Sequence, residues 1–244
     1  MRFIVMHKVD ANMEAGGPPS AEIIKNMGEL VQGSLQSGVF LNGAGLHRSA
    51  RRARLKSTGG EVAVTSGPYA GQNELVASFT MISAKSIDDA VAHARKLASS
   101  LGGDIEIEIG PVVEPWDLGM LPKPEGNVPG RFLLLCKSTP ADEAGDTAEK
   151  HAAAVRQLAA ALNNDGAVLA AESLAPSARG ARLPPTGKSK RMWVDGPFAE
   201  TKELIAGFSL LELPSKAEAL AWADRYAAIL VDCEVDVREV NPAK

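Results

Sequence analysis

The sequence predicts an α+β protein that contains two copies of one folded unit. Residues 64–70, VTSGPYA, reappear as residues 193–199, WVDGPFA, so that Gly67 and Gly196 occupy equivalent positions 129 residues apart. Further segments match in the same order at that offset or one residue less: 2–5 with 131–134, 49–55 with 177–183, and 74–79 with 203–208. Repeats of this length predict two folded domains, because solenoid repeats are only about 20–50 residues long.

The boundary between the repeats is a segment rich in proline and glycine. We place the first repeat at 1–114, a linker at 115–130 and the second repeat at 131–244. Proline and glycine disfavour regular structure and keep such a segment extended. Because Trp116, Met120 and Leu121 are apolar, we expect the linker to lie against a protein surface.

Each repeat opens with a short apolar strand, expected at 3–6 and 132–136. An exposed loop follows, and then a helix at 21–36 and 148–163, whose second copy has apolar residues at helical spacing. Glycine at 38 and 166 ends each helix, and a further strand begins at 39–41 and 167–170. An arginine-bearing stretch, a strand at 190–194 in the second copy, and the SGPY or DGPF turn come next.

The last three elements of each repeat are a strand, a helix and a strand. The strand is expected at 75–82 and 204–213. The helix, at 87–100 and 216–229, begins after Ser86 or Ser215, each followed three residues later by an acid, which is typical of a helix amino terminus. The closing strands, 105–109 and 235–238, alternate apolar and charged residues, so one face is expected to be wet.

The order β-α-β-β-β-α-β corresponds to a ferredoxin-like, split β-α-β plan with one extra strand. Such a sheet has helices on one face only, and its other apolar face needs a cover. A second sheet related by pseudo-twofold symmetry is the simplest cover. We therefore expect each repeat to form one sheet, and the two repeats to pack sheet to sheet as an intramolecular pseudo-dimer.

Composition narrows the range of functions. The net charge is −4 and the isoelectric point is about 5.7, which argues against a nucleic-acid partner even though residues 47–56 form a local basic cluster. No apolar run approaches the ~18–20 residues of a membrane span. Cys136 and Cys233 lack metal-ligand spacing, so we expect reduced thiols in a cytoplasmic protein. We expect no bound metal or cofactor, because the chain contains no CxxC, HExxH, P-loop or GxGxxG motif.

Residues 193–203, WVDGPFAETKE, followed by IAGF at 205–208, resemble the signature of the DGPF-domain, YCII-related family. The resemblance covers the second half and, more faintly, the first, so the chain is similar to a tandem of two such domains. It implies a dimeric α+β barrel of ferredoxin-like units. Some relatives accompany extracytoplasmic-function sigma factors, and the wider superfamily includes a dehydrochlorinase-like lyase in which a His–Asp pair in the cleft matters.

The motif acid is the first candidate for chemistry. Asp195 matches it, with Gly196, Pro197 and Phe198 completing the motif, whereas the first repeat has Ser66 in place of the acid. A single acid–base site in the second repeat is one interpretation. The alternative is structural, because Asp before Gly-Pro starts a turn by accepting backbone N–H bonds, and serine can do the same.

The other candidates are basic or aromatic. His151 is a possible partner of Asp195, although a histidine at a helix amino terminus is commonly just exposed. Arg179 and Arg182 keep their type in both repeats, as Arg51 and Arg54, and could hold an anionic small molecule together with Phe198 and Lys202. The alternative for the arginines is an ion pair to acids such as Glu74 or Glu203.

Two hypotheses about function remain open. In the first, the chain binds a small molecule and is a cofactor-free lyase or isomerase in which Asp195 accepts or donates a proton. In the second, it is a non-enzymatic interaction protein associated with a sigma factor, or a ligand sensor. The internal pseudo-dimer is compatible with a monomer and with further dimerisation.

Overall fold

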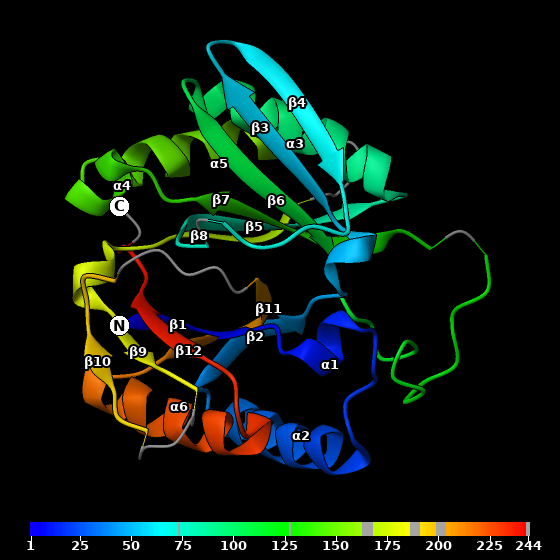
Figure 1. The fold of residues 1–244 in the computed structure, drawn as a ribbon, viewed down its shortest axis with the longest axis vertical. Helices are drawn as coiled ribbons and strands as arrows, with labels where there is room; N and C mark the ends of the chain where they lie inside the picture. Colours follow the sequence, from blue (N-terminus) through cyan, green and yellow to red (C-terminus); the bar gives the residue numbers. More distant parts are fainter. Residues whose placement is uncertain (73, 127, 163–167, 186–190, 199–203, 243–244) are drawn as a thin grey trace.

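The computed structural model describes residues 1–72, 74–126, 128–162, 168–185, 191–198 and 204–242. Within these ranges, two six-stranded antiparallel sheets lie face to face, with helices on both outer sides (Figure 1). One, here called the β1 sheet, has the order β10 (Val194–Asp195), β9 (Ala181–Leu183), β12 (Val235–Glu239), β1 (Arg2–Lys8), β11 (Ile205–Glu212) and β2 (Phe40–Gly45). The other, the β7 sheet, has the order β4 (Glu61–Ser66), β3 (Ala53–Thr58), β6 (Ile105–Pro111), β7 (Gly130–Lys137), β5 (Val76–Ala84) and β8 (Val168–Ser173).

Two long helices cover the outer face of each sheet. Helices α2 (Ala21–Gln36) and α6 (Lys216–Leu230) lie on the β1 sheet, and α3 (Ile87–Leu101) and α5 (Ala148–Ala161) lie on the β7 sheet. The predicted caps of α3 and α6 are confirmed, since the Ser86 hydroxyl accepts from Asp89 N at 3.1 Å and that of Ser215 from Glu218 N at 3.3 Å. The α+β class of the prediction is therefore confirmed.

The expectation that each repeat forms its own sheet is wrong. Strands β1 and β2 belong to the first repeat but lie in the sheet that holds β9 to β12, and β7 and β8 of the second repeat lie with β3 to β6. The reason lies in the segment after β2, which does not turn back. Leu46 instead bridges Val112, next to β6, and in the second repeat Leu174 bridges Val240. The chain thus changes sheets midway through each repeat.

Two smaller expectations are also corrected. The loops after the first strands contain short helices, α1 (Ala11–Glu14) and α4 (Pro140–Ala144), which begin at the caps Asp10 and Thr139. The linker does not lie against a surface along its length, because the side chains of Met120 and Leu121 are 57% and 60% exposed. Short 3-10 helices, η1 (Ser49–Arg51) and η2 (Ser177–Arg179), precede β3 and β9.

The core consists of three apolar layers. The middle layer fills the space between the sheets, where the rings of Phe79 and Phe208 lie 5.0 Å apart between their centroids. One outer layer joins the β7 sheet to α3 and α5, and the other joins the β1 sheet to α2 and α6 around Trp222 and Tyr226. Strands such as β5 and β11 are buried on both faces, and their sequences are accordingly mostly apolar, with a few small hydroxyl residues.

Truncation of the middle layer should cost much of the stability of the fold. We expect Phe208→Ala to lower the free energy of unfolding by about 3–5 kcal/mol, because it removes a buried ring and leaves a cavity between the sheets. Urea denaturation followed by circular dichroism measures this. The matched control is Leu169→Ala, since Leu169 is 47% exposed on β8. Equal losses in the two variants would contradict the placement of the core.

Candidate functional site

The SGPY and DGPF turns pack against the short 3-10 helices. A β-carbon on Gly67 would lie 1.8 Å from the carbonyl oxygen of Ser49, and one on Gly196 would lie 1.9 Å from that of Ser177. No side chain fits in that space, so both positions require glycine. The Gly-Pro peptide bond is cis in both turns. The glycine of the motif therefore has a packing role that both repeats share.

The motif acid lies at the surface. The Asp195 side chain is 80% exposed, and one of its oxygens is 2.8 Å from Nζ of Lys216 on α6. In the first repeat the equivalent residues are Ser66 and Ile87, so the acid and its basic partner are both replaced. The acid that distinguishes the second repeat thus forms a surface ion pair. Asp195 and His151 do not contact each other, because Asp195 pairs with Lys216 and His151 with Asp142.

The aromatic residue of the motif covers an arginine. The guanidinium of Arg182 lies 4.5 Å from the centre of the Phe198 ring, and that of Arg54 lies 4.3 Å from the centre of the Tyr69 ring. Arg182 also binds both carboxylate oxygens of Asp236, at 2.6 and 2.9 Å. These contacts favour the ion-pair interpretation of Arg182, which is engaged within the protein.

The remaining ligand-binding candidates have different locations. Arg179 is 55% exposed and forms an ion pair with Glu239 at 2.5 Å. Arg54 pairs with Glu74 at 3.0 Å, as the ion-pair alternative predicts. Lys202 and the acid equivalent to Glu74, Glu203, lie outside the described residues.

Behind each turn is a buried cluster of charges. In the first, Glu108 is held by Arg52 at 2.6 Å, Arg54 at 3.2 Å and Lys137 at 3.4 Å. Burial alone would raise the pKa of Glu108, but these three cations lower it to about 2. Asp236 takes the equivalent place in the second cluster, where Lys8 lies 3.2 Å away.

The two clusters take one arginine from different segments, Arg52 from the end of η1 and Arg238 from β12. Arg52 lies beside Gly110, whereas in the second repeat the equivalent residues are Gly180 and Arg238. A β-carbon on Gly180 would lie 2.9 Å from Cδ of Arg238. The glycine makes room for the arginine side chain opposite it. Each cluster therefore has one guanidinium in this region, and the positions of the arginine and the glycine are exchanged between the two clusters. Such clusters stabilise the fold only as complete sets, because a single buried charge is costly.

His151 is the buried residue with the clearest chemical arrangement. Its Nε2 donates to Oδ1 of Asp142 at 2.9 Å, and its Nδ1 lies 2.8 Å from Oγ of Ser78 on β5. A carboxylate only accepts hydrogen bonds, so the proton of the neutral ring lies on Nε2 and Nδ1 accepts from the serine. The alternative that His151 is simply exposed at the helix amino terminus is wrong, because the residue is 5% exposed.

Asp142 holds the histidine in this orientation. Its Oδ2 accepts from the backbone N and the hydroxyl of Thr139, at 2.7 and 2.6 Å, and its Oδ1 also accepts from Thr147. Burial would raise the pKa of Asp142, but the hydrogen bonds from His151, Thr139 and Thr147 hold that pKa well below its usual range. The carboxylate is therefore a fixed negative charge beside the imidazole.

A pocket of about 360 Å³ opens beside this pair. It lies between the carboxyl end of α3 and the amino ends of α4 and α5, and Asp142, Thr147, Lys150 and His151 are among the residues that line it. The amino end of α5 contributes a partial positive charge, and Lys150 contributes a full one. The pocket thus combines a fixed acid–base pair with one lysine, one helix amino end and a second acid, Asp104.

The equivalent place on the β1 sheet is different. His7 replaces Cys136, and the Tyr226 hydroxyl oxygen lies 2.6 Å from its Nδ1. Gly207 replaces Ser78, and Met13 replaces Asp142. Burial and then the charges of Lys8 and Arg52 lower the pKa of His7 to about 4. The His–Asp–Ser arrangement is therefore present on one side of the molecule.

Sequence reasoning found His151 but missed Asp142 and Ser78. The signal for Asp142 was Thr139 three residues earlier, the spacing of a capping box. No local signal identified Ser78, because the strand that carries it lies far from His151 in the sequence.

A scan against protein-family models matches the YCII-related domain twice, over residues 1–107 and 130–241. The chain belongs to the YCII-related family. The match covers two successive segments of this YCII-related protein, as expected for a tandem repeat. Neither the curated proteins nor the solved structures contain a significant match.

Among the described residues, no three His, Cys, Asp or Glu side chains are grouped so that they could hold a metal ion. None of the described helices is both long and apolar enough to span a membrane.

The low pKa of His7 predicts a pH dependence of stability. The unfolded chain takes up a proton near pH 6.5 and the folded chain only near pH 4, so the free energy of unfolding falls as the pH drops between these values. We expect His7 to contribute a fall on the order of 3 kcal/mol, and His7→Gln to remove this contribution. Urea titrations of both proteins across this range measure the difference. Identical pH profiles would show that His7 is not the titrating group.

Proposed function

We propose that this YCII-related protein binds a small anionic molecule in the pocket beside His151, and that the His151–Asp142 pair moves a proton of that molecule. The observation that carries the proposal is the pair itself, a buried imidazole held by a carboxylate in the wall of a pocket. Aspartate orients the ring, so that in the neutral form Nδ1 is the unprotonated nitrogen that a general base requires.

The chemistry follows from the two states of the ring. Neutral His151 accepts a proton from a carbon acid of the substrate at Nδ1, and Asp142 stabilises the imidazolium that forms. Return of that proton to another carbon of the substrate gives an isomerase, and departure of a leaving group gives a lyase. Ser78 is hydrogen-bonded to Nδ1 and is not among the residues that line the pocket, so in this proposal its hydroxyl relays the proton to Nδ1.

The role predicted for Asp195 is reassigned in this proposal. Its exposed carboxylate is solvated and paired with Lys216, which supports a role in the turn and at the surface. Asp142 supplies the acid of the His–Asp pair instead.

We infer further that the strands form the closed barrel of two ferredoxin-like units that the family resemblance implies. Supporting this, β12, β1, β11 and β2 follow one another in one sheet, and β6, β7, β5 and β8 in the other. The Leu46–Val112 bridge joins the end of β2 to the end of β6, and the Leu174–Val240 bridge joins the end of β8 to the end of β12, so the two sheets are connected at two places. In this arrangement each unit combines the first half of one repeat with the second half of the other.

A thermal-shift screen against small carboxylic acids tests the proposed site. A ligand that binds the native state should raise the melting temperature of the wild type, and His151→Asn should lose that rise because the pocket loses its base. Each shift is measured against the same variant without ligand, so that altered stability is separated from altered binding. The control is Asp195→Asn, which should respond as the wild type does.

Two outcomes would contradict the proposal. If Asp195→Asn lost the shift and His151→Asn kept it, the site would lie at the DGPF turn. If a ligand shifted all three proteins equally, it would bind outside both regions.

A further inference from the structure

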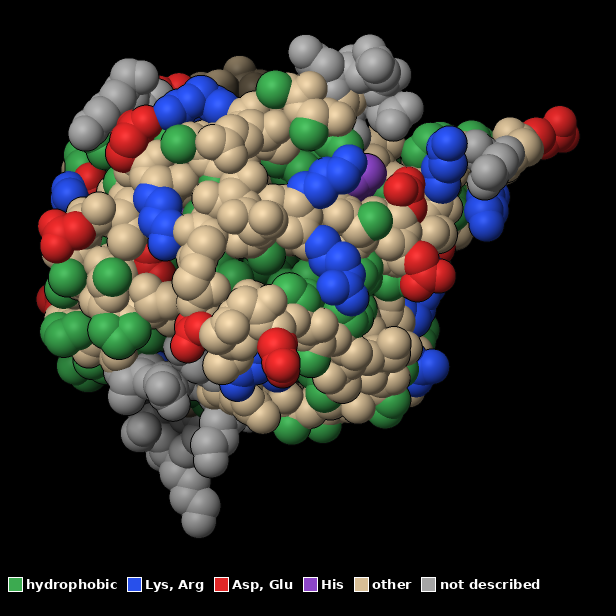
Figure 2. Space-filling view, turned by 90° about the horizontal axis from the view of Figure 1, so that it is seen from above, with side chains coloured by type: hydrophobic (Ala, Val, Ile, Leu, Met, Phe, Trp, Pro, Cys, Tyr) green, Lys and Arg blue, Asp and Glu red, His purple; other side chains and the backbone are tan. Residues whose placement is uncertain are grey.

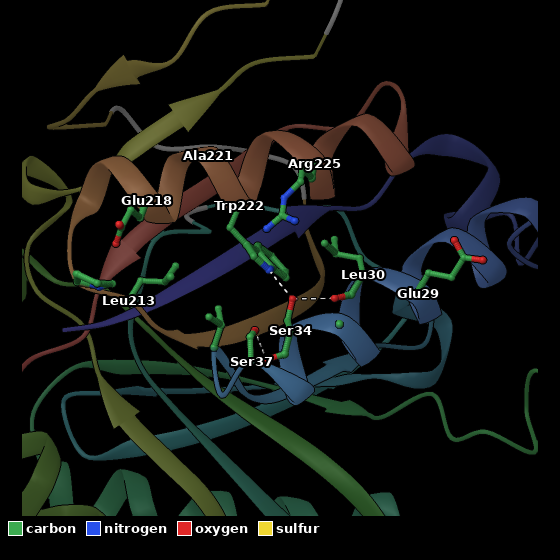
Figure 3. Close-up of a pocket in the computed structure, with 12 residues that line it drawn as sticks. Glu29, Leu30, Ser34, Ser37, Leu213, Glu218, Ala221, Trp222 and Arg225 are labelled. Carbon is green, nitrogen blue, oxygen red and sulfur yellow. Dashed lines mark hydrogen bonds between the residues drawn. The ribbon is translucent and has the colours of Figure 1, made fainter.

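An open groove lies on the outer face of the β1 sheet, between α2 and α6 (Figure 3). Its volume is about 720 Å³, twice that of the pocket at His151. Leu30, Leu213 and Trp222 provide apolar lining, and the charged residues Glu29, Glu218 and Arg225 also line it. No part of the proposed acid–base site lies in this groove.

The groove exists because α2 packs loosely. Ser34 is the one residue of α2 that is buried, and its hydroxyl accepts from Trp222 Nε1 at 2.8 Å and donates to the Leu30 carbonyl at 2.7 Å. In the other pair of helices, Leu162 takes the equivalent place, four residues before the matching glycine, and lies in the core at 3% exposure. A serine where the other repeat has a leucine leaves the space between α2 and α6 unfilled.

The linker between the repeats projects from the body on the right of Figure 1, and Figure 2 shows the same projection from above. Its root is fixed, because Glu114 binds Arg131 with both oxygens, at 2.9 and 2.7 Å, and Asp117 lies 3.1 Å from Nε2 of His47. Beyond this root, residues 118–125 carry the exposed side chains of Met120 and Leu121. We call residues 118–125 the arm.

We propose that the arm of one chain docks in the α2–α6 groove of a second copy of this chain. The arm has an exposed apolar pair, Met120 and Leu121, followed by Pro122-Lys123-Pro124-Glu125. Residues 118–121 form a turn and bend that present the apolar pair, and the prolines that follow restrict the chain before it binds, which lowers the entropic cost of docking in an apolar groove. The arm has no equivalent within either repeat, and each chain has one arm and one such groove.

The charges of the two surfaces are complementary. Lys123 on the arm can face the acids of the groove, Glu29 and Glu218, and Glu125 can face Arg225. Within the part of the chain that the structure describes, the side chains of Glu218 and Arg225 form no ion pair. Opposite charges at the rim of an interface select the partner and its register more than they add affinity.

Sedimentation velocity over a range of protein concentrations tests self-association. The wild type should pass from monomer to a larger species as concentration rises, while Leu121→Glu and Ala221→Arg should each remain monomeric. Both substitutions are at exposed positions, so the fold is retained. The matched control is Leu169→Glu, which introduces the same charge at another exposed leucine and should associate as the wild type does.

A wild type that stays monomeric at every concentration would overturn the proposal. So would undiminished association of Leu121→Glu and Ala221→Arg. Charge reversal gives a further check, because Lys123→Glu should weaken association and Glu218→Lys in the same chain should restore it.

Disulfide trapping then identifies the contact itself. Leu121→Cys and Ala221→Cys are made in separately tagged chains and mixed under oxidising conditions. A disulfide should join one chain of each kind, and Leu169→Cys in place of Leu121→Cys should give none. Association without the expected disulfide would assign the interface to another surface and overturn the arm–groove contact.

Discussion

The structure depends on the burial of the inner face of each sheet against the other. Phe79 and Phe208 meet at the centre of that contact, and the strands around them are buried on both sides. Neither sheet could keep this face dry alone, since its helices lie on the opposite side. Each repeat also contributes strands to both sheets. The contact between the sheets therefore holds the two repeats together as well.

Buried charge is a second constraint, and it explains much of the conserved pattern between the repeats. The arginines at 54 and 182 face acids on the neighbouring strand and carry the aromatic residue of the turn on their other side. The DGPF motif is thereby accounted for largely by structure: its glycine fits against a 3-10 helix, and its aromatic ring covers a guanidinium. The residues that favour chemistry, His151 and Asp142, lie apart from the motif.

The sequence allowed the class of fold, the duplication and the main helices to be predicted, because apolar spacing and the caps at Ser86 and Ser215 are local signals. The exchange of strands was not predictable in the same way. Nothing in residues 46–52 distinguishes a chain that returns to its own sheet from one that crosses to the other, since pairing is decided by residues far along the chain. The candidate site shows the same limit: His151 was visible in the sequence, but Ser78 becomes its neighbour only through the contact of α5 with β5.

The residues that face each other between β1 and β11 differ from those that face each other between β7 and β5. His7, from the first repeat, occupies space that Gly207 of the second leaves open, and a β-carbon there would lie 2.6 Å from the imidazole. Cys136, from the second repeat, lies instead across from Ser78 of the first. Two copies of the first repeat would place a histidine opposite a serine at this position. Two copies of the second repeat would place a cysteine opposite a glycine. The two repeats therefore differ at this contact, where the histidine of the first repeat faces the glycine of the second and the cysteine of the second faces the serine of the first.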